Sequence, residues 1–122
     1  MASILIFEDD NDLRLTMKRM LQFEGYEVLD APNGDIGIRL YRETPADLII
    51  TDIFMPDKEG IQTIIELKKE DPNVKIIAIS GGGNKGSLNY LNSAEKLGVE
   101  KTFQKPVDVD VLLDGIKQIL DN

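Results

Sequence analysis

Short apolar runs and longer segments with helical spacing alternate along this sequence, and this alternation restricts the chain to one class of fold. Each apolar run is bounded by turn residues, as is typical of a buried strand. The predicted strands are 3–7, 26–29, 48–52, 74–79 and 99–103. Between and after them, apolar residues recur at helical spacing and predict helices near 13–24, 36–41, 61–68, 88–97 and 112–120.

Strands that alternate with helices in this way form a parallel sheet with helices on both faces, joined by right-handed crossovers. Of the two common doubly wound strand orders, five strands in 122 residues favour the flavodoxin-like one. We therefore predict an α/β fold, a flavodoxin-like (βα)5 doubly wound parallel five-stranded sheet of order 2-1-3-4-5. It should form a single domain over residues 1–122.

The predicted third strand ends on a carboxylate. Leu48 to Ile50 is apolar, Asp52 follows, and Met55-Pro56 prevents the strand from continuing. Taken alone, Asp52 is more simply a strand-end residue that accepts hydrogen bonds from loop amides. In open α/β sheets, however, ligands bind at the carboxyl ends of the strands.

Three other predicted strands also lead to polar groups at this edge. Glu8-Asp9-Asp10 follows the first strand, which should lie beside the third, so these carboxylates should meet Asp52 across the crevice. Ser80 follows the fourth strand and Lys105 the fifth. Four such groups around one edge favour a common site over coincidence.

Each of these groups also has a structural explanation. The acidic residues could serve the amino terminus of a helix, Ser80 could be a turn residue, and Lys105 could be solvated. The second predicted strand leads only to Asp30-Ala31-Pro32 at the edge of the sheet.

The composition excludes several kinds of catalytic site, metal site and binding partner. The chain has no Cys and no His, which excludes disulfides, thiolate sites, histidine bases and the usual zinc sites. Its net charge of −8 argues against a nucleic acid or an anionic membrane as a direct partner. No apolar stretch is long enough for a membrane span and no signal peptide is evident, so we expect a cytoplasmic protein.

Converging carboxylates form a hard-oxygen site of the kind that prefers Mg²⁺. A carboxylate beside such a cation can attack phosphorus and become an aspartyl phosphate. Lys105 would then contact the phosphoryl oxygens, with Pro106 holding its loop, and the hydroxyl of Ser80 would hydrogen-bond to the phosphoryl group. Whether the Lys105–Pro106 bond is cis cannot be predicted from the sequence.

Four segments in this order resemble the receiver domain of two-component response regulators. They are Ile4-Leu5-Ile6-Phe7-Glu8-Asp9-Asp10, Asp52-Ile53-Phe54-Met55-Pro56-Asp57-Lys58-Glu59-Gly60, Ala78-Ile79-Ser80-Gly81 and Lys105-Pro106. The resemblance covers essentially the whole chain. It implies a switch that accepts a phosphoryl group from the phosphohistidine of a histidine kinase or phosphotransfer protein.

The resemblance also implies a role for each site residue. Asp52 matches the phosphoacceptor, and Glu8 and Asp9 match the acidic pair, with Asp9 the more direct Mg²⁺ ligand. The backbone carbonyl of Phe54 matches the remaining protein ligand. Ser80 and Lys105 match the hydroxyl and the lysine of the family's motif. Output would pass to an unknown protein partner through the fourth helix, fifth strand and fifth helix.

The sequence departs from the family pattern in two places. The family usually has an aromatic residue three positions before the motif lysine, but Thr102 stands there and Phe103 follows, facing the opposite side by strand alternation. Phe54 and Gly82 flank the expected path of the attacking water, and neither can orient water by hydrogen bonding, so we predict slow self-dephosphorylation.

The glycines Gly81 to Gly83 are read as a loop, either simply flexible or rearranging when Ser80 moves.

We expect a stand-alone receiver that catalyses only its own phosphorylation and dephosphorylation, and so not an enzyme with a separate substrate. A piece of a longer regulator would have the same sequence. An aspartate-dependent phosphatase would usually need a second Asp at the position of Phe54. A degenerate receiver that only binds a partner remains the other alternative, and it would fail to bind Mg²⁺.

Overall fold

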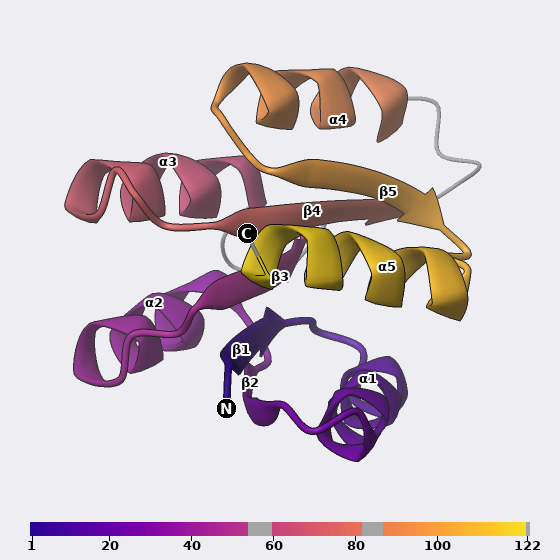
Figure 1. Ribbon diagram of the computed structural model, residues 1–122. Helices are drawn as coiled ribbons and strands as arrows, with labels where there is room; N and C mark the ends of the chain where they lie inside the picture. The colour runs from indigo at the N-terminus through magenta and orange to yellow at the C-terminus, as the bar shows by residue number, and fades with distance from the viewer. Residues whose placement is uncertain (54–59, 82–86, 122) are drawn as a thin grey trace.

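The computed structural model describes residues 1–53, 60–81 and 87–121. Strands and helices alternate, as predicted (Figure 1). The strands are β1 (Ser3–Phe7), β2 (Glu27–Ala31), β3 (Leu48–Asp52), β4 (Ile76–Gly81) and β5 (Lys101–Lys105). The helices are α1 (Asn11–Phe23), α2 (Gly34–Glu43), α3 (Gly60–Glu70), α4 (Ser87–Lys96) and α5 (Val109–Leu120).

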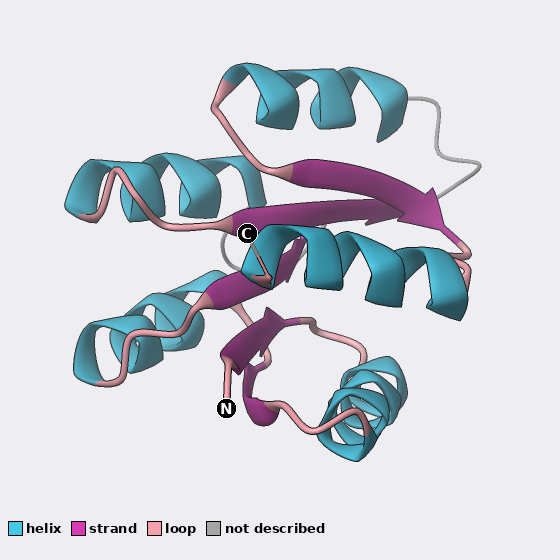
Figure 2. Ribbon diagram, viewed as in Figure 1, coloured by secondary structure: helices cyan, strands magenta, loops and turns pink. Residues whose placement is uncertain are grey.

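The strands form one parallel sheet in the order β2-β1-β3-β4-β5, which confirms the predicted fold class (Figure 2). The order reverses between β1 and β3, so the carboxyl ends of these two strands lie side by side. Phe7 of β1 is paired with Thr51 of β3, and Asp52 of β3 is paired with Ile79 of β4. This register brings the residues after Phe7 next to Asp52.

Helices cover both faces of the sheet, and a separate apolar cluster fills each interface. On one face, α1 and α5 contribute Met17, Leu21, Leu112 and Ile116. On the other face, α2, α3 and α4 contribute residues that include Ile38, Ile64 and Leu91. Because the central strands are buried on both sides, β3 is apolar without alternation as far as Ile50.

Three strands begin later than predicted, because local turns occupy the residues just before them. Tyr26 was assigned to the second strand, but its N–H donates to the carbonyl of Leu21 and closes α1 around Gly25, which has a φ of +96°. Val74 lies in a turn because its N–H donates to Asp71, so β4 begins later than predicted. β5 begins at Lys101 because the N–H of Val99 closes α4 on Ala94.

The same three strands also extend further than predicted. β2 continues to Ala31, which is paired with Phe7, and β4 and β5 continue to the pair Gly81 and Lys105. Gly81 is therefore a strand residue and not part of a glycine loop. Gly82 and Gly83 lie outside the described residues. No helix in the described part of the chain is long and apolar enough to cross a membrane.

Candidate functional site: an acidic cluster with a half-buried lysine

Asp52 is the last residue of β3, and its position depends on a close backbone approach from α3. Asp52 is buried, and Gly60, the first residue of α3, donates its N–H to the carbonyl of Ile53 at 2.8 Å. A Cβ at Gly60 would lie 2.5 Å from the carbonyl oxygen of Asp52, where no side chain fits. A glycine at this position therefore lets α3 begin in direct contact with the backbone of Asp52.

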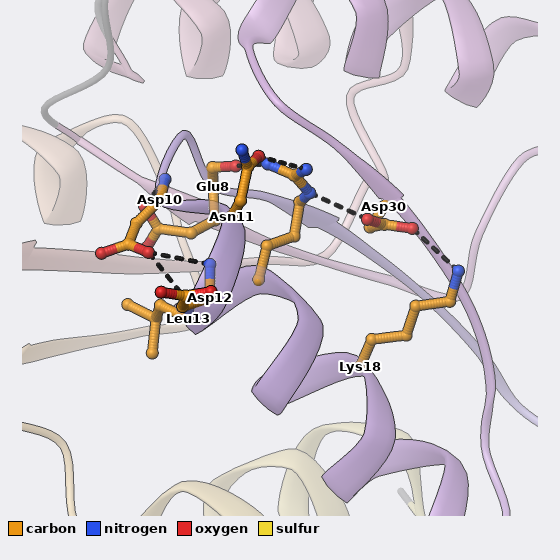
Figure 3. Close-up of polar contacts among 8 residues, drawn as sticks. Glu8, Asp10, Asn11, Asp12, Leu13, Lys18 and Asp30 are labelled. Atoms are coloured by element: carbon orange, nitrogen blue, oxygen red, sulfur yellow. Dashed lines mark hydrogen bonds and ion pairs between the residues drawn. The ribbon is translucent and has the colours of Figure 1, made fainter.

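The three acidic residues after β1 have different roles. Asp10 caps α1, because its side chain accepts hydrogen bonds from the N–H groups of Asp12 and Leu13 (Figure 3). The structural explanation therefore holds for Asp10. Glu8 is buried and Asp9 is exposed, and one carboxylate oxygen from each lies within 4.8 Å of the other and of an oxygen of Asp52.

Lys105 is the cation of this cluster. Its Nζ donates to Oδ2 of Asp52 at 2.6 Å and to Oε1 of Glu8 at 3.0 Å. The bond between Lys105 and Pro106 is cis, a point that the sequence left open. Burial alone would lower the pKa of Lys105, but the hydrogen bonds and charges of Asp52 and Glu8 outweigh burial and raise it. Lys105 is therefore charged at neutral pH.

Glu8 is the most perturbed carboxyl group of the cluster. Its pKa is raised to about 7, mainly by burial and further by the negative charge of Asp52. Lys105 and the N–H of Asp10 oppose this shift without cancelling it. Around neutral pH, a proton and a cation would thus compete for the same buried oxygens.

Ser80 lies near the end of β4, as predicted, one residue after the partner of Asp52. Its side chain is fully buried, and its Oγ has no hydrogen-bond partner among the described residues. A buried hydroxyl without a partner costs free energy, so it marks a position where an acceptor oxygen would be favourable.

The donor set fits a divalent cation. Glu8, Asp9 and Asp52 offer hard oxygen ligands on one side of the pocket, and the only positive charge among the described groups that touch Asp52 is Lys105. The acidic cluster can therefore hold a metal ion. Phe54, whose carbonyl was predicted as a further ligand, lies outside the described residues, as does Gly82.

Thr102 and Phe103 face opposite sides of β5, as predicted. Thr102 Oγ1 donates to Oε1 of Glu95 on α4 at 3.1 Å, whereas Phe103 packs in the cluster on the α5 side. A Cβ added to Gly115 of α5 would lie 3.1 Å from the ring of Phe103, so this side chain already fills its space.

No role was predicted for Arg14 or Asp30. Arg14 Nε donates to Oδ2 of Asp30 at 2.9 Å, and Lys18 Nζ donates to Oδ1 of the same carboxylate (Figure 3). Burial alone would raise the pKa of Asp30, but Lys18 and Arg14 outweigh burial and lower it. Residues of two elements form this contact, so no local sequence pattern predicts it.

The comparison with known families gives a single assignment. Residues 4–117 match the response regulator receiver domain, and the chain belongs to this family. Receiver domains are signalling switches of two-component systems, and in this chain the pocket of Glu8, Asp9 and Asp52 fits a phosphoacceptor aspartate beside a metal site.

Curated relatives align along nearly the whole chain. Response regulator receiver protein CpdR of Brucella abortus is 38% identical over 98% of each chain. Sporulation initiation phosphotransferase F of Bacillus subtilis is 28% identical, over 96% of this chain and 92% of its own length. The chain spans only 26% of another relative, the transcriptional regulatory protein GlrR of Escherichia coli, with 32% identity over 98% of this chain.

Solved structures agree. A CheY-like receiver domain protein from Methanospirillum hungatei superposes with a TM-score of 0.91 and 32% identity, covering 99% of this chain and 94% of that one. The response regulator protein TrrA of Thermotoga maritima, solved in complex with Mg²⁺ and BeF, superposes with a TM-score of 0.86 and 28% identity, covering 98% of this chain and all of that one.

Proposed function

We propose that this chain is a phosphorylation-driven switch that accepts a phosphoryl group on Asp52. The observation that carries the proposal is the placement of the Asp52 carboxylate, 2.6 Å from Lys105 Nζ and within 4.8 Å of Glu8 and Asp9. One buried carboxylate thus contacts a fixed cation and also belongs to a cluster of carboxylates that can hold a metal ion. This arrangement suits an attack on phosphorus better than it suits a structural ion pair.

The chain's own residues would divide the work of the transfer. An oxygen of Asp52 bonds to phosphorus, the bond from phosphorus to the donor's histidine nitrogen breaks, and that nitrogen keeps the electron pair and takes a proton. Lys105, now paired with Asp52, neutralises charge on the transferred group. The Oγ of Ser80, which lacks a partner among the described residues, donates to a phosphoryl oxygen.

Glu8, Asp9 and Asp52 would hold Mg²⁺, together with the carbonyl of Phe54 that the family resemblance implies. When bound, the ion neutralises the negative charge that the carboxylates and phosphoryl oxygens share. The solved complex of the relative TrrA with Mg²⁺ and BeF supports this choice of ion.

The phosphoryl donor would be a histidine kinase or a phosphotransfer protein, and the readout would be a protein that binds α4, β5 and α5. The chain would act as one receiver domain over residues 1–122, in the cytoplasm, and would catalyse only its own phosphorylation and slow dephosphorylation. The family assignment supports the donor class, and the Thr102–Glu95 hydrogen bond gives β5 a direct contact with α4.

The direct test is the intact mass of the protein after incubation with acetyl phosphate and Mg²⁺. We expect one phosphoryl addition in the wild type, none with a chelator, and none in Asp52→Asn. Asp47→Asn is the matched control, because Asp47 immediately precedes the same strand at its opposite end, and it should be phosphorylated normally. Absence of the addition in a folded wild type would favour the degenerate, partner-binding receiver.

A further inference from the structure

We propose that Arg14 is a positioning residue that orients Asp9 for metal binding by fixing the peptide that links it to Glu8. This inference rests on the proposed Mg²⁺-dependent function. The guanidinium makes three hydrogen bonds: Nε with Asp30 Oδ2 at 2.9 Å, Nη1 with the carbonyl oxygen of Glu8 at 2.8 Å, and Nη2 with Asn11 Oδ1 at 2.7 Å. These three acceptors belong to the end of β2, the end of β1 and the start of α1.

The contact with the Glu8 carbonyl lies where the chain leaves the sheet. The N–H of Glu8 is still bound to the carbonyl of Ala31 on β2, but β1 ends at Phe7. Arg14 therefore supplies the Glu8 carbonyl with a donor at the point where strand pairing stops. A backbone carbonyl that is bonded to a fixed guanidinium holds the whole peptide plane, because the peptide unit is rigid.

Asp9 depends on this peptide more than Glu8 does. The Glu8 side chain is held independently, by Lys105 at Oε1 and by the N–H of Asp10 at Oε2. The Asp9 side chain is exposed and makes no hydrogen bond or ion pair with the described residues. Its direction is therefore set by the backbone on either side of it, with Arg14 before it and the Asp10 cap after it.

Asp30 in turn holds Arg14. It accepts hydrogen bonds from Arg14 and Lys18 together, and the Arg14 side chain is only 16% exposed (Figure 3). A planar guanidinium can bond three acceptors in a fixed geometry, whereas an ammonium cannot reproduce it. The site thus has an outer layer of residues that do not touch the ion but determine where its ligand lies.

The sign of the effect distinguishes positioning from charge. Arg14 is positive, so loss of its charge alone would make the acidic cluster more attractive to Mg²⁺. If Arg14 orients Asp9, its replacement should weaken Mg²⁺ binding instead. Lys18 is the matched control, because it pairs with the same carboxylate and carries the same charge, but its hydrogen bond is with Asp30 and not with the loop.

The test is a titration of the whole chain with Mg²⁺, followed by amide chemical shifts, with the unfolding free energy measured in parallel. Arg14→Lys and Arg14→Gln should both raise the Kd for Mg²⁺ by about tenfold. Lys18→Gln should leave it unchanged or slightly lower it. Asp30→Asn, which loosens the guanidinium but keeps it, is the second variant and should raise the Kd by about threefold.

A double-mutant cycle with Asp9→Asn completes the test. Once Asp9 cannot act as a charged ligand, Arg14→Lys should have little further effect on the Kd. Unchanged Mg²⁺ binding in both Arg14 variants and in Asp30→Asn, or full additivity with Asp9→Asn, would overturn the inference alone. Failure of the wild type to bind Mg²⁺ would instead overturn the proposed function on which the inference rests.

Discussion

Near the amino ends of the strands, two polar pairs are satisfied within the chain. At the carboxyl ends of β1, β3 and β4, by contrast, two carboxylates are buried close together and a hydroxyl has no hydrogen-bond partner among the described residues. Near the amino ends, Tyr41 donates to Asp71 at 2.8 Å, and Asp47 accepts from the N–H of Ser3 at 2.8 Å. At the carboxyl ends, Glu8 and Asp52 share a single lysine. The first arrangement stabilises the fold, and the second keeps buried like charges and a hydroxyl that an external cation and an external acceptor would stabilise.

The difference shows how a small domain can carry a reactive site. The amino end and the two apolar clusters provide stability, so the carboxyl end can keep groups that oppose folding. Proteins often retain such locally unfavourable groups at functional sites. The variants described below test whether the two ends of the sheet differ in this way.

The largest effect on stability should come from Gly60→Ala. A Cβ there would lie within 2.5 Å of the Asp52 carbonyl oxygen and of the Ile53 Cα, which are backbone atoms that cannot easily move. We expect a loss of about 2–4 kcal/mol in the free energy of unfolding, measured by urea denaturation. Gly81→Ala is the control, since nothing lies within 4 Å of a Cβ at that position. Equal losses in both variants would show that the close contact of Gly60 with the Asp52 backbone is not the cause of the loss.

The pH dependence of stability should identify Glu8. Its pKa rises from 4.5 to about 7 on folding, so between these values the folded state binds a proton that the unfolded state releases. The stability that this proton contributes to the folded state is lost as pH rises through that interval. Without metal, Glu8→Gln should therefore be more stable than the wild type at pH 8, by about 1–3 kcal/mol, with little difference near pH 5.

Urea denaturation in a chelator at the two pH values measures this difference. Glu27→Gln, at an exposed carboxylate on the edge strand, should show none. A Glu8→Gln variant that is less stable than the wild type at pH 8 would mean that Glu8 stabilises the metal-free fold. The two ends of the sheet would then not differ as described.

Two hydroxyl deletions compare the ends directly. Tyr41→Phe removes a paired hydroxyl and takes the hydroxyl donor from Oδ2 of Asp71, so it should cost about 1–2 kcal/mol. Ser80→Ala removes a buried hydroxyl that has no partner among the described residues, so it should be neutral or stabilising by up to about 1 kcal/mol. Both are read as changes in the free energy of unfolding, and the opposite order would contradict the comparison.

The smallest effect should come from Thr102→Val, which removes the hydrogen bond to Glu95. This bond lies near the surface, so we expect a change of less than about 0.5 kcal/mol in unfolding free energy. Binding of Mg²⁺, measured by titration, should not change. A large loss of Mg²⁺ affinity would instead mean that Thr102 belongs to the metal site.

The sequence predicted the fold class because its signal is periodic and repeated. Ser3–Phe7 and Leu48–Asp52 were predicted with their observed bounds, since buried strands flanked by acidic or turn residues leave little choice. The displaced bounds of β2, β4 and β5 arise from helix-closing turns and from pairing with neighbours. The strand pairings join residues that are distant in the sequence and leave no local pattern, whereas the turns are local and only shift where each strand begins.

For the candidate site too, some features could be predicted from the sequence and others depend on the tertiary structure. Glu8, Asp9, Asp52 and Lys105 were predicted to meet because the ends of parallel strands share one edge, and the structure brings them together. The different role of Asp10, the missing partner of Ser80 and the contact of Arg14 with the Glu8 carbonyl depend on side-chain directions. The sequence does not specify these directions until the tertiary structure is known.

The most direct test of the central claim is the free energy of unfolding in a chelator, in Mg²⁺, and in Mg²⁺ with beryllofluoride, a mimic of the phosphoryl group. If the carboxyl end keeps groups for an external cation and a phosphoryl group, Mg²⁺ at a hundred times its Kd should stabilise the wild type by about 2.7 kcal/mol. Beryllofluoride should add a further increment that Ser80→Ala largely loses. No stabilisation by Mg²⁺, or an equal gain from beryllofluoride in Ser80→Ala, would contradict the account.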